Sequence, residues 1–381
     1  MNYRVPFNKP FLTGKELSYI EEAVNSGKIS GNGLFTKKCH AHFEEKYGFS
    51  KCLLTTSCTD ALEMAAILIG IEPGDEIILP SYTFVSTANA FRLRGAKLRF
   101  VDSREDFPGI DEEAIEPLIN RRTKAIVVVH YAGIATDMKK IMNLAEKYGL
   151  WVVEDAAQAI DSFYIKDNGD KKPLGGIGHL GAFSFHETKN IISGEGGMLT
   201  INDERLRDRA EIIWEKGTNR SAFFRGEVDK YGWVDIGSSF LPSEVIAAFL
   251  YAQLEQLPII QARRIEIWET YYEGLKSWAH EKEVQLPPSY SYSTNNAHMF
   301  YMVFPNQESR SEIISHLKEK GILSVFHYLS LHDSPYFKMH HDGRLLKNTD
   351  KFSDCLLRLP LFYGLTPQEN AEIISLVKEC L

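Results

Sequence analysis

Short runs rich in β-branched residues alternate with helical segments between residues 50 and 200, and this alternation constrains the fold most. In the segments CTDALEMAAILIG and TDMKKIMNLAEKYG, apolar residues recur at the spacing of one helix face. Strands that alternate with helices in this way build mostly parallel sheets with helices on both faces, which is the α/β class. The expected strands are CLLTTS, EIILPS, KLRFVD, KAIVVVHYAG, LWVVEDAA and GAFSFHE.

A change of pattern after residue 240 indicates a second, smaller unit. Apolar positions repeat from Pro242 to His280, so we expect a long helix or a helix pair leading out of the first unit. Beyond it, HMFYMVF and ILSVFHY have the pattern of strands, and SEIISHLKEKG and PQENAEIISLVKEC that of helices. We therefore predict a large α/β domain over residues 1–245 and a small α+β domain over residues 246–381.

Charge and composition narrow the range of partners. The net charge is −8, from 43 basic and 51 acidic residues, whereas nucleic-acid-binding proteins usually present a basic face, so we expect no nucleic-acid partner. No apolar run approaches the roughly 20 residues that cross a bilayer, and MNYRVPFNKP lacks the apolar core of a signal peptide. The 5 cysteines are scattered without CxxC pairs, which indicates reduced thiols. A soluble cytoplasmic protein with no membrane partner is the expectation.

Residues just beyond the expected strands carry the chemistry, because ligands of open α/β sheets bind at the carboxyl ends of strands. Ser57, Cys58 and Thr59 stand at the turn into a helix, where hydroxyl and free N–H groups suit a phosphate. An ordinary N-cap is the commoner role of such residues. Tyr82 and Phe84 come after the next strand and offer a face for a planar ring, although a lone Phe more often packs in the core.

Two further strand ends carry a carboxylate and an amine. Asp155 ends an apolar strand and Gln158 comes three residues later; a buried Asp needs a cationic partner, unless it only caps a helix. Ser184 ends the strand FSF, and Lys189 lies in the turn before SGEGG. A lysine partly removed from water favours the neutral amine, which forms an imine with a carbonyl, although most lysines are solvated.

Together these four features match one cofactor. Pyridoxal 5'-phosphate requires a phosphate site, an aromatic surface against its ring, a carboxylate for its ring nitrogen and a lysine for its aldehyde. Each feature is weak alone, but few other cofactors require the whole set. We therefore predict a pyridoxal phosphate enzyme.

The order of the motifs SCTDAL, PSYTFVSTANA, VEDAAQ, FSFHETKN and SGEGG resembles the DegT/DnrJ/EryC1 family of sugar aminotransferases, which have the type I aspartate aminotransferase fold. The resemblance extends from VPFNKP to LRLPLFYGLT and so covers nearly the whole chain. It implies a large domain with a mostly parallel sheet and a smaller C-terminal domain. It also implies a homodimer, because the family's sites take residues from both subunits.

The resemblance assigns roles to individual residues. Lys189 would bind the cofactor covalently and move the proton at the amine carbon. Asp155 would hold the ring nitrogen, and Gln158 the phenolic oxygen. Phe84 would stack on the ring. The phosphate would be bound by Ser57, Cys58, Thr59 and Ser184.

One position departs from the family pattern. Where many members have GYNYR, this chain has GSSFL at residues 237–241, so Ser239 stands in place of an Asn that reaches the neighbouring subunit's phosphate. A serine still donates one hydrogen bond. Asn219 and Arg220, in GTNR, are alternative donors.

The resemblance also implies the substrates. L-glutamate would give its amino group to the cofactor and leave as 2-oxoglutarate, and the acceptor would be a dTDP-linked 4-keto-6-deoxy hexose. The carboxylate and diphosphate groups need polar or cationic partners, for which a solvated surface position is an equally good explanation. The partners we predict are Arg220, Arg225, Lys230, His327, Tyr328 and His332. We expect no metal, because the clustered histidines lack a supporting carboxylate pattern.

Several alternatives stay open. The chain could act as a sugar 3-aminotransferase, or as a 4-aminotransferase that forms another epimer or uses a GDP- or UDP-linked sugar. Sugar dehydratases of this scaffold have a histidine in place of the lysine, which Lys189 disfavours. A non-catalytic regulatory protein that only binds the cofactor would be expected to lack Lys189 or Asp155, and both are present.

Overall fold

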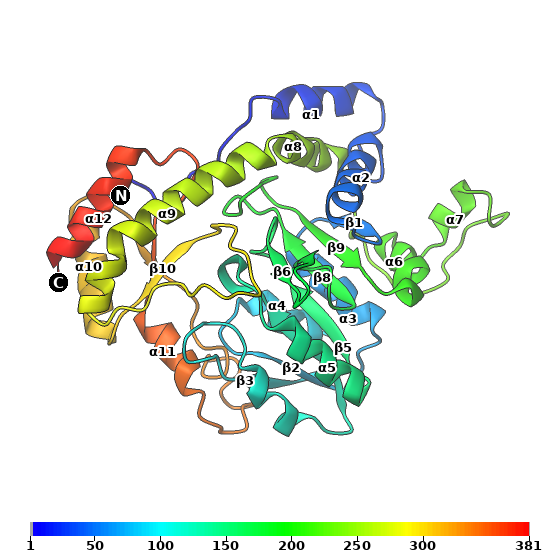
Figure 1. The fold of residues 1–381 in the computed structure, drawn as a ribbon. Coiled ribbons are helices and arrows are strands. Elements are labelled where there is room, and N and C mark those ends of the chain that lie inside the picture. The colour runs from blue at the N-terminus through cyan, green and yellow to red at the C-terminus, as the bar shows by residue number, and fades with distance from the viewer. Residues whose placement is uncertain (1–2, 381) are drawn as a thin grey trace.

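The computed structural model of the chain describes residues 3–380 and is organised around a seven-stranded sheet (Figure 1). The strand order is β1-β9-β8-β5-β4-β2-β3; the strands from β8 to β3 run parallel, and β9 is antiparallel to both of its neighbours. All six strands predicted for this region are present, whereas β9 was not predicted. The bounds are β1 (Cys52–Thr55), β2 (Glu76–Pro80), β3 (Lys97–Val101), β4 (Thr123–Val129), β5 (Trp151–Asp155), β8 (Leu180–Ser184) and β9 (Gly197–Ile201).

Helices cover both faces of this sheet, because successive side chains of a strand point to opposite sides. In β4, Ile126 and Val128 belong to one apolar core, while Ala125 and Val127 belong to the other. The predicted α/β class is confirmed. The first core is closed by α1 (Glu16–Asn25), α2 (Leu34–Tyr47), α5 (Met138–Tyr148) and α8 (Glu244–Glu255), and the second by α3 (Cys58–Leu68), α4 (Val85–Arg92) and α6 (Arg207–Trp214).

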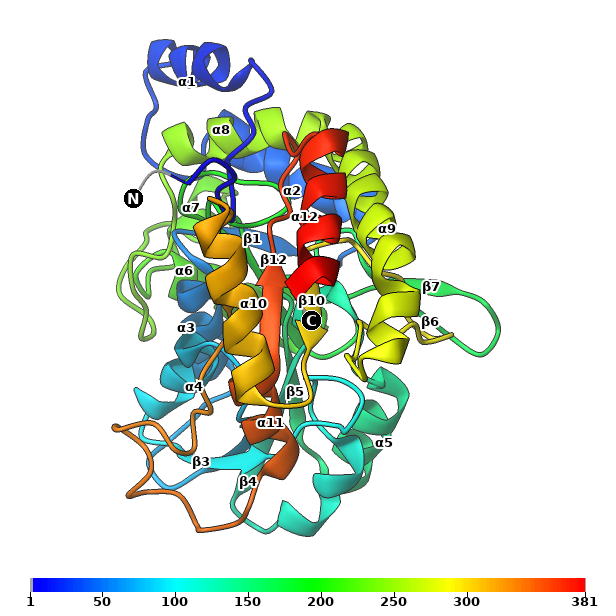
Figure 2. The same ribbon diagram turned by 90° about the vertical axis from the view of Figure 1, so that its left-hand side faces the viewer.

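The smaller unit has an antiparallel sheet in the order β10-β12-β11, with α12 between α9 and α10 (Figure 2). The predicted helices and the strands in HMFYMVF and ILSVFHY are present, whereas the central strand β12 was not predicted. Leu357 and Leu359 of β12 pack into the core of this unit, which also takes in Val5 from the start of the chain. The elements are α9 (Leu257–Glu281), β10 (Phe300–Val303), α10 (Gln307–Glu319), β11 (Val325–Phe326), α11 (Lys347–Cys355), β12 (Leu356–Leu359) and α12 (Pro367–Cys380).

The predicted helix pair after Pro242 is α8 and α9, which are bent by 63° at Gln256. Within residues 3–380, no single helix has the length and apolar composition of a membrane span; only this bent pair meets that test jointly. The predicted division of the chain at residues 245 and 246 stays a prediction.

Short elements complete the chain. A hairpin of β6 (Phe163–Ile165) and β7 (Lys171–Pro173) comes after β5. Residues 217–237, which include α7 (Arg220–Phe224), form an arm that projects from the body beside α6 (Figure 1). Single turns of 3-10 helix are η1 (Glu112–Ala114), η2 (Glu116–Leu118), η3 (Tyr131–Gly133) and η4 (Glu204–Leu206).

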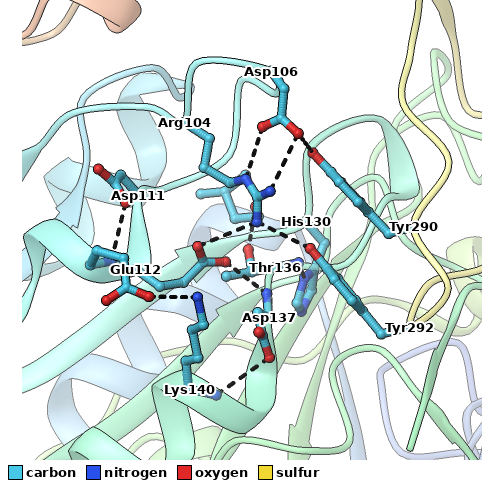
Figure 3. Close-up of polar contacts among 12 residues, drawn as sticks. Arg104, Asp106, Asp111, Glu112, His130, Thr136, Asp137, Lys140, Tyr290 and Tyr292 are labelled. Atoms are coloured by element: carbon cyan, nitrogen blue, oxygen red, sulfur yellow. Dashed lines mark hydrogen bonds and ion pairs between the residues drawn. The ribbon is translucent and has the colours of Figure 1, made fainter.

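A polar network centred on Arg104 joins the loop after β3 to the segment between α9 and β10 (Figure 3). The Arg104 guanidinium donates to Asp106 (Nε–Oδ1, 3.0 Å) and to the Tyr292 hydroxyl (3.2 Å), and it pairs with the buried Glu112 carboxylate (3.6 Å). The guanidinium carbon of Arg104 also lies 4.8 Å from the centre of the Tyr290 ring, and this ring stacks on Tyr292. These contacts fix the connection to the smaller unit against the large one.

We expect Arg104→Gln to lower the free energy of unfolding by about 2 kcal/mol, since the loss leaves the Glu112 carboxylate buried without its cation. The free energy is measured by urea unfolding. The control is Lys139→Gln, which removes an exposed ion pair with Asp167 and should change stability little. Equal effects of the two substitutions would show that the network does not hold the units together.

Candidate active site

The ends of β5 and β8 lie side by side, and they bring Asp155 and Lys189 into one buried environment. Asp155 is the last residue of β5; its carboxylate accepts hydrogen bonds from the Thr87 hydroxyl (2.6 Å) and the Ala157 N–H (3.1 Å). Burial raises the pKa of Asp155, and the positive charge of Lys189 and these two donors oppose the rise. Within residues 3–380 this carboxylate has no ion-pair partner, so it is a buried anion that lacks a bound cation.

Lys189 lies beyond β8 in the turn that the sequence singled out. Part of the Lys189 side chain stays accessible. Burial of its ammonium group lowers the pKa of Lys189, and the charge of Arg358 lowers it further. Cys58 and Asp155 act in the opposite direction and raise this pKa. A lysine in this state gives up its proton more readily than a solvated one and becomes a nucleophile.

The residue after Lys189 anchors the turn. Asn190 donates to the Gln261 amide oxygen (2.7 Å) and to the Asn296 carbonyl (2.8 Å), and its own side-chain oxygen lies 2.9 Å from Nδ1 of His298. All four residues are buried. The backbone that carries Lys189 is therefore held by hydrogen bonds to α9 and to the segment before β10.

The SCT turn has the geometry of a phosphate site. Ser57 caps α3, with its hydroxyl accepting from the Asp60 N–H (3.1 Å), as the ordinary N-cap interpretation required. The N–H groups of Cys58 and Thr59 open the helix and have no partner within it, so they are available to an anion. A side chain on Gly197 would meet the Ser57 and Cys58 backbone at 2.3–2.4 Å, so glycine lets β9 pack directly against the turn.

Phe84 is not a core residue. It precedes α4, 55% of its surface is exposed, and its ring centre lies 6.1 Å from that of Tyr328. Tyr328 has a φ of 45°, which is uncommon for a bulky residue, and its hydroxyl accepts from Nε2 of Gln158 (3.1 Å). Strained backbone of this kind is frequent at functional sites. Phe84, Gln158 and Tyr328 therefore lie together.

The remaining predicted cofactor residues lie at the edges of this group. Ser184 ends β8, and its hydroxyl accepts weakly from the His186 N–H (3.4 Å). Ser239 is exposed and precedes Phe240, whose carbonyl accepts from the Thr56 N–H (3.1 Å), so it lies near the SCT turn of its own chain. The side-chain oxygen of Asn219 accepts from the Gly232 N–H (2.8 Å) inside the arm.

The predicted substrate residues fall into two places. His327 and His332 are buried: Nδ1 of His327 lies 2.7 Å from the Tyr131 hydroxyl, and Nδ1 of His332 lies 2.8 Å from the Ser81 hydroxyl. Arg220, Arg225 and Lys230 are exposed on the arm. Arg225 pairs there with Glu211 (2.8 Å) and Glu227 (2.6 Å). Contacts of all six with a substrate stay a prediction.

Four residues of the site were not predicted: Thr87, Asn190, His298 and Arg358. Thr87 and Asn190 stand inside quoted motifs, PSYTFVSTANA and FSFHETKN, but nothing in the linear pattern indicates which way their side chains point. Arg358 interrupts the apolar run of LLRLPLF, which was a usable signal.

These residues fit pyridoxal phosphate. The buried Asp155 carboxylate lacks a cation that a protonated ring nitrogen would supply, and the start of α3 offers N–H groups for a phosphate. Lys189 has the lowered pKa that bond formation with an aldehyde requires. Among residues 3–380, no group of three or more His, Cys, Asp or Glu side chains is arranged for a metal ion.

Known proteins share this architecture. DesV of S. venezuelae is 29% identical, with a TM-score of 0.87 over 99% of this chain and 98% of that one. PseC of Helicobacter pylori, an aminotransferase involved in the biosynthesis of pseudoaminic acid, is 25% identical, with a TM-score of 0.87 over 100% and 99%. Spr1654 of Streptococcus pneumoniae in its PMP form is 25% identical, with a TM-score of 0.89 over 99% of each chain.

The family comparison agrees with the fold. The model of the DegT/DnrJ/EryC1/StrS aminotransferase family matches residues 10–378, nearly the whole chain. The predicted type I fold and the predicted cofactor, pyridoxal phosphate, are both confirmed, since the solved relatives include PLP and PMP forms. The chain therefore belongs to the DegT/DnrJ/EryC1/StrS aminotransferase family.

Proposed function

We propose that this aminotransferase transfers the amino group of L-glutamate to C4 of a dTDP-linked 4-keto-6-deoxy hexose and forms dTDP-4-amino-4,6-dideoxygalactose. The observation that carries the amino-transfer chemistry is the buried pair of Lys189, with its lowered pKa, and Asp155. The product would serve the synthesis of a cell-surface polysaccharide such as an O-antigen or a common antigen.

Each residue has a distinct task in this proposal. Bound pyridoxal phosphate supplies an aldehyde for amino groups and a ring that takes up electrons. Lys189 holds the cofactor at rest and moves the proton at the amine carbon once a substrate has taken its place. Asp155 keeps the ring nitrogen protonated, Gln158 binds the phenolic oxygen and Phe84 covers the ring. Ser57, Cys58, Thr59, Ser184 and, in the dimer, Ser239 bind the phosphate.

The sugar assignment is supported by sequence motifs. FHETKN, KGTNRSAFFRGEVDKY, DIGSS, NAHMFY and VFHY resemble the dTDP-4-amino-4,6-dideoxygalactose transaminase known as WecE or RffA. Three of these motifs carry residues described in the site: FHETKN carries Lys189, NAHMFY carries His298, which contacts Asn190, and VFHY carries Tyr328, which contacts Gln158. The role of PseC in pseudoaminic acid biosynthesis is consistent with an amino-sugar product.

The function is tested by incubating the cofactor-loaded protein with L-glutamate and a panel of keto-sugar nucleotides. We expect amination at C4 of the dTDP sugar in the galacto configuration, identified by NMR of the product. Lys189→Ala should abolish turnover and the visible absorbance of the lysine-bound cofactor, whereas Lys276→Ala, on the exposed side of α9, should retain both. A 3-amino product, another epimer or a preference for GDP or UDP would correct the substrate, and full activity of Lys189→Ala would refute its role.

We expect Thr87 to help set the pKa of Asp155. The Thr87 hydroxyl lowers the pKa of the carboxylate, so Thr87→Val should raise that pKa and move the acid limb of the kcat/KM profile to higher pH. Loss of one hydrogen bond to a charged group should also lower kcat about 10-fold. Asp155→Asn should lower it further, on the order of 100-fold or more, because the ring nitrogen would lose its counter-charge.

The control for Thr87→Val and Asp155→Asn is Thr270→Val, which removes an exposed hydroxyl from α9 and should leave the pH profile of kcat/KM unchanged. An unshifted acid limb in Thr87→Val would show that Asp155 does not set it.

A homodimer is supported by the arm of residues 217–237. Apolar side chains gather on it, and Trp233 is 84% exposed. Exposed apolar surface of this kind usually marks an interface. The other exposed apolar side chains of the arm are Phe224, Tyr231, Val234 and Ile236. Residues 237–241, where Ser239 lies, continue directly from it.

We expect light scattering to give twice the chain mass of 43.3 kDa. Trp233→Ser should shift the protein toward monomer on dilution and lower its specific activity in parallel, because the sites are shared between subunits. Leu345→Ser, at another exposed apolar position, should do neither. A monomer that is fully active at high dilution would contradict the shared site.

A further inference from the structure

One buried asparagine contacts two segments that carry predicted cofactor residues. Asn296 lies in the segment before β10 and is fully buried. Its side-chain amide donates to the backbone carbonyls of Gln158 (2.8 Å) and Ile160 (2.7 Å), and its side-chain oxygen accepts from the His298 N–H (3.0 Å). A carbonyl only accepts and a backbone N–H only donates, so these partners fix which way the amide points.

The main chain of the same residue holds the turn that carries Lys189. The Asn296 carbonyl accepts from the side chain of Asn190 (2.8 Å), which directly follows Lys189, and from Nε2 of Gln261 in α9 (3.0 Å). Its side chain and its carbonyl thus bind different segments. Because both belong to one residue, they set the spacing between the Gln158 backbone and the Lys189 turn.

The segment around Asn296 is itself held in place by α9. Arg264 of α9 is buried, and its guanidinium donates to the carbonyls of Ala297 (3.1 Å) and His298 (2.6 Å). Ala297 has a φ of 50°, and backbone in this conformation persists only where its surroundings hold it. Asn296 is therefore a fixed point to which the two segments attach.

A second turn orients the Gln158 side chain and packs on the same asparagine. The Ala132 N–H donates to Oε1 of Gln158 (2.6 Å), so the NH2 group of the amide is the part left to contact a ligand. Ala132 and Gly133 have φ values of 57° and 78°. A Cβ on Gly133 would lie 2.0 Å from Oδ1 of Asn296, so this turn lies directly against Asn296.

We propose that Asn296 is a positioning residue that holds the Gln158 amide and Lys189 at a fixed spacing. This inference rests on the proposed function, in which Gln158 binds the phenolic oxygen of the cofactor and Lys189 its aldehyde. These two groups are on adjacent ring carbons, so an error in the spacing of the two segments falls on the hydrogen bond from Gln158. Such a bond weakens steeply with distance and angle.

The hydrogen bond from Gln158 can be followed without turnover. The visible absorbance of the lysine-bound cofactor titrates with pH, as the proton shared by the phenolic oxygen and the lysine nitrogen is lost. A donor stabilises the oxygen most after this proton has left, so loss of the donor raises the titration midpoint. We expect Gln158→Ala to raise the midpoint by about one pH unit and Asn296→Ala by about half as much.

The double variant and a matched control separate positioning from general damage. If Asn296 acts through Gln158, Asn296→Ala should change the midpoint of the Gln158→Ala protein by less than about 0.2 pH unit, because the hydrogen bond is already gone. The control is Asn370→Ala, which removes another buried asparagine whose amide donates to a backbone carbonyl, that of Ile267 (3.1 Å). It should lower thermal stability and leave the midpoint unchanged.

Thermal unfolding verifies that each variant is folded. Asn296→Ser, which removes the amide and leaves a small polar side chain, carries the test if Asn296→Ala does not fold. It should raise the midpoint in the same direction.

Three results would overturn the proposal: an unchanged midpoint in Asn296→Ala beside a raised one in Gln158→Ala, additive shifts in the double variant, or an equal shift in Asn370→Ala. An unchanged midpoint in Gln158→Ala would refute the role that the proposed function gives Gln158, and this inference with it. A different sugar product would leave all of these titrations intact, so the sugar assignment and the positioning role fail separately.

Discussion

Two opposite charges held out of water at the ends of neighbouring strands determine the layout of this active site. Burial raises the pKa of Asp155 and lowers that of Lys189, so each group is less stable in its charged form than in solvent. The fold offsets part of this cost by donating Thr87 and Ala157 hydrogen bonds to the carboxylate. The part of the cost that is not offset leaves Asp155 suited to a ring cation and Lys189 suited to an aldehyde. The surrounding elements position these two groups.

Most of the large unit was predictable because β4, β5 and β8 are buried on both faces and are nearly continuous apolar runs. The polar residues at or just beyond the carboxyl end of each run were then the natural candidates for the site, and they included Asp155 and Lys189. Partners that converge from distant segments could not be found in this way. Thr87 lies on a helix whose orientation depends on packing, and β12 is short and begins directly after α11 without a turn signal.

The active site is shared between the two units of the chain. Tyr328 and His298 come from the smaller unit and hydrogen-bond to Gln158 and Asn190 of the large one. Their placement depends on a polar and aromatic interface, with Arg104 and its tyrosines at one edge and Tyr82 and Tyr131 nearer the reaction centre. A small change in how the units pack would therefore move Tyr328 and His298 and leave the groups around Asp155 in place.

The antiparallel strand β9 has a consequence for how the protein reaches its native state. β1, which leads into the SCT turn, pairs within the sheet only with β9, and β9 comes later in the chain than all the parallel strands of the sheet. The turn acquires its sheet support only once residues 197–201 have been synthesised and have inserted between β1 and β8. Pairings between segments so distant in sequence slow folding. The SCT turn is therefore completed late, and in nascent chains that end before β9 it lacks support from the sheet.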